Sequence, residues 1–362
     1  MKSVIYTITH KPFEGPANPL YVPLAVGCAL RDGESFGYLS DATGDNISSK
    51  NPSFCELTGI YWIWKNVKDA DCVGICHYRR YPVMEDSRSS SGERLLTAED
   101  VERILGEYDL VTSSLLTIRS DYYTGFSVDH HIKDLMTTRD VIAERAPEYL
   151  PVFEELIHGK NTYFGNIMIC PFELFDRYCR FLFDILFEVE RRTDTTGYDG
   201  YSARLYGFLA EFLLLVYVRT NGLRAYESRI AIIGEKAETA ELKEELSRLF
   251  SDGDYRGARR CILDALKVRP DLMMEASDIN GTLRMAMEAV SISDFEAAAG
   301  RTTMIEKARS FERCIAFVRK LNSGYLHGEE PGGEDRELLS EEALFVAGRV
   351  EEGLLATRDK SW

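Results

Sequence analysis

The stretch that most constrains the fold of this chain is residues 71–81, DCVGICHYRRY, where a short apolar run ends in a cluster of hydrogen-bond donors. Val73 to Cys76 has the length and apolar character of a buried strand, and buried parallel strands carry ligand-contacting groups at their carboxyl ends. Four donors follow this strand directly: His77, Tyr78, Arg79 and Arg80. Two guanidiniums and an imidazole at such a position predict a pocket for a diphosphate.

The alternative for these residues is an ordinary pair of surface charges, which is what paired arginines after a strand often are. The chain holds 59 Asp+Glu against 43 Lys+Arg, a net charge of −16. A basic cluster is therefore contrary to the overall composition, and this favours the phosphate interpretation. The same acidity disfavours nonspecific binding to nucleic acid or anionic lipid, so we expect no nucleic-acid partner.

Strand and helix patterns alternate along the first 233 residues. Apolar residues recur at three- and four-residue spacing from Asn51 to Val67, which predicts a helix between strands at residues 2–9 and 72–76. Further predicted strands are residues 110–113 and 166–170. Further predicted helices are residues 98–107, 132–146, 172–191 and 201–219. Such alternation predicts an α/β domain over residues 1–233.

The pattern changes after residue 233. A charged linker at 234–240 precedes a helical pattern that continues from 241 to 320, in which residues 250–270 resemble one tetratricopeptide-like hairpin. A connector rich in glycine and proline at 328–334 leads to a last predicted helix at 340–356. We therefore expect residues 241–362 to form a smaller all-α accessory domain that offers packing or protein contacts rather than chemistry.

Cysteine usage and hydropathy indicate the compartment. The eight cysteines are scattered, without the short paired spacings of a zinc site or the density of a disulfide scaffold, which fits a reducing cytoplasm. The N-terminus has no apolar segment of signal-peptide type. The apolar run 208–218 is too short for a membrane span and is interrupted by Glu211. We expect a soluble cytoplasmic protein without a transmembrane segment.

The polar loop at residues 40–51 can serve either as a connector or as a ligand-binding loop, because its Gly, Asn and Ser residues suit both. The residues of this loop that could contact the phosphate-bearing ligand, called the donor below, are Asn46, Ser48, Lys50 and Asn51. The aromatic helix that follows carries Trp62 and Trp64, which are more typical of a core than of a sugar platform. Glu56 and Lys65 flank that aromatic core, and Lys65 is a further candidate donor contact.

Residues 129–134, DHHIKD, concentrate titratable groups and are a candidate source of a proton acceptor. The alternative is helix capping by Asp129. Glu211 lies in an otherwise apolar helix, where an unpaired carboxylate is costly, so it either pairs with a cation such as Arg204 or points into the site. The three candidate bases are Asp134, His131 and Glu211. Further candidate ligand contacts, for a sugar or for the molecule that receives the transferred group, are His130, Asn166 and Arg204.

A divalent metal is not expected at the diphosphate pocket. The one Asp-x-Asp pattern near it, Asp69 and Asp71, lies before the strand and thus at its wrong end. A solvent-facing turn is the simpler interpretation of that pattern. We therefore expect the positive charge of the residues after the strand to replace a metal ion.

Several segments resemble the capsular and exopolysaccharide synthesis glycosyltransferase domain family, long catalogued as a domain of unknown function. The segments that carry the resemblance are residues 9–12 (THKP), 45–51 (DNISSKN), 56–66 (ELTGIYWIWKN), 74–81 (GICHYRRY), 130–135 (HHIKDL), 166–169 (NIMI), 175–179 (FDRYC) and 204–211 (RLYGFLAE). They span residues 2 to 230 in the family's order. One departure is Phe212, where the family pattern has an arginine.

The resemblance implies a GT-A-like nucleotide-sugar fold and transfer of a hexose from a sugar nucleotide, UDP-linked in our expectation, to a surface-polysaccharide or lipid-linked glycan acceptor. The end of the first strand in such folds receives the nucleotide, which makes Thr9, His10 and Lys11 donor contacts. Peripheral contact with membrane-bound synthesis machinery at the inner face of the membrane is also implied. No firm cofactor is implied beyond the donor substrate.

Two other function classes use similar residues. A phosphoesterase or phosphotransferase needs the same arginines, although the chain has no phosphate-loop glycine pattern. A noncatalytic module that binds a nucleotide or a glycan uses the same pocket as a transferase. Turnover of sugar nucleotides separates the three classes.

Overall fold

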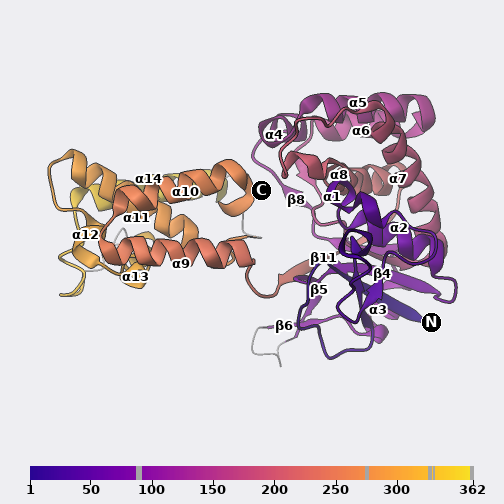
Figure 1. The fold of residues 1–362 in the computed structure, drawn as a ribbon, viewed down its shortest axis with the longest axis horizontal. Helices are drawn as coiled ribbons and strands as arrows, with labels where there is room; N and C mark the ends of the chain where they lie inside the picture. Colours follow the sequence, from indigo (N-terminus) through magenta and orange to yellow (C-terminus); the bar gives the residue numbers. More distant parts are fainter. Residues whose placement is uncertain (87–91, 274–276, 325–327, 329–330, 359–362) are drawn as a thin grey trace. The chain divides into compact units, whose positions relative to one another are not determined.

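A computed structural model describes residues 1–86, 92–273, 277–324, 328 and 331–358. The chain divides into two units, Met1–Ile233 and Gly234–Trp362, and each is described by itself. Residues 359–362 of the expected accessory domain and residues 329–330 of the expected connector lie outside the described residues. The predicted α/β organisation of the first unit is confirmed (Figure 1).

The first unit is built on a nine-stranded sheet of order β3-β2-β1-β4-β10-β7-β11-β5-β6. Its strands are β1 Ser3–Thr9, β2 Tyr21–Ala25, β3 Leu39–Ser40, β4 Cys72–His77, β5 Arg80–Glu85, β6 Glu93–Leu95, β7 Leu110–Ser113, β10 Met168–Pro171 and β11 Ala225–Ile232. A separate ribbon pairs β8 Leu116–Thr117 with β9 Asn161–Thr162.

Strands β1, β2, β3 and β4 are parallel, so their carboxyl ends meet at one edge of the sheet. Ile8 pairs with His77, which places Thr9 beside the end of β4. Strand β10 is antiparallel to β4, with Met168 opposite Ile75. The residues just before Met168 therefore reach the same edge of the sheet as His77.

The helices of the first unit are α1 Asn51–Phe54, α2 Leu57–Asn66, α3 Ala98–Leu105, α4 Tyr122–Asp129, α5 Ile132–Arg145, α6 Leu150–Ile157, α7 Phe172–Arg192 and α8 Leu205–Thr220. The described residues of the second unit form α9 Ala237–Asp252, α10 Tyr255–Val268, α11 Thr282–Ala298, α12 Met304–Ala308, α13 Phe311–Ser323 and α14 Glu341–Arg358. No helix in the described ranges has both the length and the apolar content needed to cross a bilayer.

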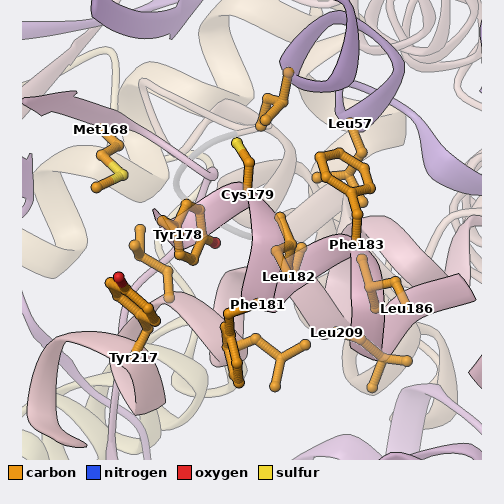
Figure 2. Close-up of a cluster of buried hydrophobic side chains, with 14 of the residues drawn as sticks. Leu57, Met168, Tyr178, Cys179, Phe181, Leu182, Phe183, Leu186, Leu209 and Tyr217 are labelled. Carbon is orange, nitrogen blue, oxygen red and sulfur yellow. The ribbon is translucent and has the colours of Figure 1, made fainter. Parts of the chain in front are cut away.

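The sheet of the first unit buries both faces, as the alternation of side chains in β4 shows. Val73 and Ile75 join the core formed with α2, α7 and α8, whereas Cys72 and Cys76 join the core on the α3 side. In Figure 2, α7 residues such as Leu182 lie between β10 and the neighbouring helices. Helix α8 is apolar on most sides because it is buried in this layer, which makes each of its polar residues informative.

The prediction of one helix from Asn51 to Val67 is wrong, because the chain breaks it after Phe54. Cys55 adopts a φ of +49°, and its amide closes α1 on the carbonyl of Asn51. Helix α2 then begins at Leu57. This break turns Glu56 away from the path of a continuous helix, and no glycine in the sequence signals it.

Candidate functional site

The turn that enters β10 is the centre of the candidate site. Gly165 and Asn166 both have positive φ, +97° and +46°. Asn166 Nδ2 donates to Glu56 Oε1 at 2.7 Å and to the carbonyl of Gly207 at 3.1 Å. Its Oδ1 is buried and has no partner within the described residues. The side-chain amide of Asn166 thus links the α1–α2 junction to helix α8, and its oxygen can still accept a hydrogen bond from a ligand.

Glu56 reaches this turn because the backbone of α8 allows a close approach. A Cβ atom at Gly207 would lie 3.3 Å from the Cβ of Cys55 and 3.4 Å from its Sγ, so a side chain there would push the α1–α2 junction away. Burial, with help from Glu56, raises the pKa of the Cys55 thiol to about 11. Cys55 is therefore a neutral packing residue, and Glu56 supplies the charge.

Glu211 is the second carboxylate of the site. It lies four residues after Gly207, on the same side of α8, and its Oε1 accepts the amide of Gly165 at 2.8 Å. Burial and the neighbouring Glu56 raise its pKa to about 7, against the opposing effects of Arg80, the Gly165 amide and Arg204. Glu211 therefore exchanges a proton near neutral pH.

Two guanidiniums approach the carboxylates from different elements. Arg80, the first residue of β5, places Nη1 3.6 Å from the position that a Cβ at Gly165 would take. Arg204, at the end of a 3₁₀ turn Ser202–Arg204, has its Nε 3.5 Å from the Sγ of Cys55. The site thus combines two guanidiniums with two carboxyl groups around Gly165 and Asn166.

His77 ends β4 beside this cluster and hydrogen-bonds to the backbone of Gly165. Burial lowers its pKa, while Glu56 opposes that effect and Arg80 and Arg204 add to it. Its Nε2 is buried without a hydrogen-bond partner among the described residues. His77 is therefore a neutral imidazole that can accept or donate a hydrogen bond, rather than a fixed cation.

Arg79 points elsewhere, although it neighbours Arg80 in sequence. It is 8% exposed, and its Nε donates to the carbonyl of Ile233 at 3.3 Å. His77 and Arg80 pair across the β4–β5 hairpin, so Tyr78 and Arg79 form its two-residue turn. The structure therefore brings Arg80, and not the Arg79 guanidinium, to Gly165 and Glu211.

The ends of β1 and β4 carry a second group of residues predicted from the sequence. Thr9 is buried, and its Oγ1 donates to the carbonyl of Lys11 at 2.6 Å. The Lys11 Nζ lies 5.4 Å from the ring centroid of Tyr78, and the exposed His10 ring meets Tyr78 edge-on at 5.5 Å. Phe13 adds an aromatic contact to Tyr78 at 5.9 Å, which the sequence pattern did not indicate.

The polar side chains of the loop at residues 40–51 form hydrogen bonds mostly with neighbouring residues of the same segment. Asn46 Oδ1 accepts the amide of Ser48, the Ser48 hydroxyl donates to the buried Asp41, and Asn51 Nδ2 donates to the carbonyl of Cys55. Lys50 Nζ pairs with Glu190 at 2.5 Å. The contacts of these four predicted donor residues shape the loop, and the structure does not bring them to the Gly165–Asn166 turn.

Lys65 lies outside the cluster as well. Its Nζ is 3.4 Å from the ring centroid of Trp64, beside a hollow of about 810 Å³ between α2 and α7. Asp69 and Asp71 both contact Lys2, through its side chain and its amide, at the amino-terminal end of β4. That location is the one expected for this Asp-x-Asp pattern.

The histidine segment lies at the start of α5. Asp134 is buried, and its Oδ2 accepts the hydroxyl of Tyr198 at 2.7 Å, while burial raises the pKa of this carboxyl. His131 is exposed and packs on Tyr198 with ring centroids 4.2 Å apart. His130 packs on Phe208 at 4.4 Å. His130 lies within reach of the charge of Arg204, whereas Asp134 and His131 lie against Tyr198.

Phe212, the departure from the family pattern, is fully buried and stacks on Tyr122 at 4.0 Å. It belongs to the core, so it neither adds to the site nor removes Glu211 from it. The site residue that the sequence did not assign is Glu56. Its position depends on the positive φ of Cys55 and on the absence of a side chain at Gly207, and of these only the glycine is visible in the sequence.

The family described as "Domain of unknown function (DUF4422)" matches residues 4–222. Among solved structures, the chain is similar to the apo structure of the bifunctional glycosyltransferase WbbM, with a TM-score of 0.60 and 28% identity. That likeness covers 65% of this chain and 46% of the other, so the chain spans less than half the length of the protein it matches. No curated protein matches the sequence.

Proposed function

We propose that this chain, which belongs to the DUF4422 family, is a glycosyltransferase that moves a hexose from a sugar nucleotide to a hydroxyl of a surface-polysaccharide acceptor. The likeness to a glycosyltransferase structure supports the reaction class. The residues at the carboxyl edge of the sheet support the roles given below. Transfer requires charge compensation at the departing diphosphate and a group that takes the acceptor's proton.

The observation that carries this proposal is the meeting of Arg80 and Arg204 with Glu56 and Glu211 around one turn, beside the end of β4. Glu56, Glu211 and Arg80 are half-buried. A dense charged group is costly to keep partly out of water, and functional sites are where such groups are retained. Ligands of α/β sheets bind outside the carboxyl ends of the strands, which is where this group lies.

We assign the diphosphate to Arg80 and Arg204. Their guanidiniums stay charged and offer several donors in a fixed geometry, which suits the oxygens of a leaving diphosphate. They take the place of a divalent ion in this scheme. The nucleotide then lies toward Thr9, Lys11 and Tyr78, where the aromatic rings at the ends of β1 and β4 offer a surface for a base such as uracil.

Glu211 is the proton acceptor in this scheme. Of the three candidates from the sequence, Asp134 and His131 lie against Tyr198, whereas Glu211 lies beside Gly165 and Asn166. A carboxyl with a pKa raised to about 7 is matched to proton transfer near neutral pH. As the acceptor oxygen bonds to the anomeric carbon, its proton goes to Glu211, and the bond from that carbon to the diphosphate breaks.

A panel of sugar nucleotides tests the proposal. The purified protein is incubated with each donor in the presence of EDTA, and release of the nucleoside diphosphate is followed. Slow hydrolysis of one donor, lost in Arg80→Ala and kept in the surface control Arg139→Ala, is the expected result. Phosphate release from simple monoesters would instead indicate a phosphoesterase, and donor binding without turnover would indicate a binding module.

A further inference from the structure

A group of aromatic rings lies beside Arg204, and we call it the aromatic shelf. Its members are His130, His131, Tyr198, Tyr201 and Phe208. His130 lies parallel to Tyr201 with centroids 5.5 Å apart, and Tyr201 meets Phe208 at 5.1 Å. These rings come from the α4–α5 corner, the loop before α8 and α8 itself, so the fold gathers them from three segments.

The shelf is the outer layer of a deeper aromatic stack. Beneath it, Phe126 packs on His130 at 4.7 Å and on Tyr122, and Tyr122 stacks on Phe212. Phe126 is 5% exposed and Phe212 is fully buried. By contrast, His131 is exposed and the other shelf residues are half-buried. The structure therefore supports these rings from below and leaves part of their surface open.

The shelf is continuous with the carboxylate cluster. The guanidinium of Arg204 lies 5.3 Å from the ring centroid of Phe208, and its Nε contacts the Sγ of Cys55, the residue before Glu56. Phe208 also follows Gly207, whose carbonyl accepts the amide of Asn166. The shelf therefore adjoins the residues around Gly165 through two segments: Phe208 follows Gly207 in α8, and Arg204 contacts the residue before Glu56.

Each basic group beside the shelf has an acidic neighbour, and Arg204 interacts with Glu56. Lys133 lies over the Tyr198 ring at 5.1 Å, and it interacts with Asp194. His131 interacts with Asp199 in the same way. Burial lowers the pKa of His130 to about 4, with smaller effects from His131 and Arg204 against Asp199, so His130 is neutral at physiological pH. A balanced surface with open aromatic faces suits an uncharged, amphipathic ligand.

We propose that the aromatic shelf is the acceptor subsite and binds a neutral sugar residue of the acceptor glycan. This inference rests on the proposed function. The C–H face of a pyranose or furanose packs on an aromatic ring, and its hydroxyls take the polar partners around the rim. An acidic sugar finds no uncompensated cation on the shelf itself. The position beside Arg204 then directs the acceptor's hydroxyl toward Glu211.

The test compares acceptors and variants. The probes are methyl β-galactoside, methyl β-glucoside, methyl N-acetyl-β-glucosaminide and methyl β-glucuronide, each as acceptor with the donor that the panel identifies. In Tyr201→Ala we expect the KM for the best neutral acceptor to rise ~10-fold, the size of one lost aromatic contact, and to exceed any rise in donor KM by ~5-fold. Tyr201→Phe restores the wild-type acceptor KM, because it keeps the ring.

Tyr226→Ala is the matched control, since Tyr226 is a half-buried tyrosine on β11 that packs on Tyr108. Its acceptor KM stays at the wild-type value. The assignment of the acceptor subsite to the shelf is overturned if the enzyme prefers the glucuronide, or if folded Tyr201→Ala keeps the wild-type acceptor KM. In either case, donor hydrolysis by the wild type would still support the proposed function. Absence of any donor turnover by the wild type overturns the proposed function, and the acceptor subsite with it.

Discussion

Two carboxylate sites lie at the carboxyl edge of the same sheet, one buried and one half-buried, and they differ in how far their hydrogen-bonding capacity is used. Asp41, after β3, is fully buried and accepts four hydrogen bonds. Its donors are the amides of Gly27 and Cys28 and the hydroxyls of Ser48 and Thr58. Glu56 and Glu211 receive one hydrogen bond each within the described residues, from Asn166 and Gly165.

This difference separates a carboxylate whose acceptor positions are filled from two that keep acceptor positions open. The donors around Asp41 come from four points along residues 27–58, so a satisfied charge fixes the loops that frame the edge of the sheet. The two glutamates keep unused acceptor positions, and burial raises the pKa of Glu211 to about 7. Unused capacity beside two guanidiniums indicates a place where a ligand completes the hydrogen bonds.

The largest expected effect separates the two adjacent arginines. In Arg80→Ala, turnover of the preferred sugar nucleotide falls ~10²–10³-fold, because the departing diphosphate loses a positioned charge. In Arg79→Ala, turnover stays within ~5-fold, since that guanidinium donates to the carbonyl of Ile233. Initial rates of nucleoside diphosphate release measure both. Equal losses in the two variants would contradict the assignment of the diphosphate to Arg80.

The next effect concerns stability at the satisfied site. Asp41→Asn replaces an acceptor oxygen by an amide that faces the existing donors, so we expect the free energy of unfolding to fall by about 3–4 kcal/mol. Asp45→Asn, on the exposed part of the same loop, changes it by less than about 0.5 kcal/mol. Urea unfolding followed by circular dichroism measures both. A loss of less than about 1 kcal/mol in Asp41→Asn would remove the structural role.

The third prediction concerns Glu211, whose raised pKa should make the free energy of unfolding depend on pH. The folded-state pKa of Glu211, about 7, lies above its ordinary value of 4.5. The unfolded chain therefore binds fewer protons between these values, and the stabilisation is complete below pH 4.5 and lost as pH rises through 7. Because one pKa unit corresponds to about 1.4 kcal/mol, the full loss across this range amounts to about 3.5 kcal/mol.

Glu211→Gln isolates that effect. The glutamine cannot titrate, so the wild type minus variant difference in unfolding free energy should fall by about 2.5 kcal/mol from pH 5 to pH 8. Groups common to both proteins cancel in the difference. Urea unfolding at four pH values across this range provides the measurement. A difference that stays constant with pH would show that Glu211 titrates normally.

The smallest expected effect tests the polar loop. Lys50 pairs with Glu190, and the side chains are 39% and 29% exposed, so solvent screens this pair. Lys50→Met should change the unfolding free energy by less than about 1 kcal/mol and donor turnover by less than ~2-fold. The assays are those used for Arg80 and Asp41. A large loss of turnover would mean that the lysine leaves Glu190 to contact the donor.

Much of the sheet and part of the site could be predicted because they follow from local patterns. The apolar run after Asp71 predicts β4, and the parallel order places Thr9 beside its end. Glu211 is conspicuous as a carboxylate in an apolar helix, and Arg204 is a natural partner. In these cases the signal lies in the residue types themselves, within one turn or one strand.

The parts that could not be predicted depend on backbone geometry between distant segments. Glu56 reaches the turn through the positive φ of Cys55, and non-glycine residues give no sequence signal for that conformation. The division between Arg79 and Arg80 depends on a two-residue hairpin into β5, a strand that contains Pro82 and lacks a clear alternating pattern. The sequence places these side chains near one another but does not decide which one turns inward.

The conformation of Cys55 has a consequence for engineering this protein. A non-glycine residue at φ +49° carries strain of about 1–3 kcal/mol, which glycine would release. Selection for heat resistance alone should therefore favour Cys55→Gly, and the more flexible junction would hold Glu56 less firmly. At this single position, a change that raises the melting temperature would loosen the residue that holds Asn166 in the proposed site.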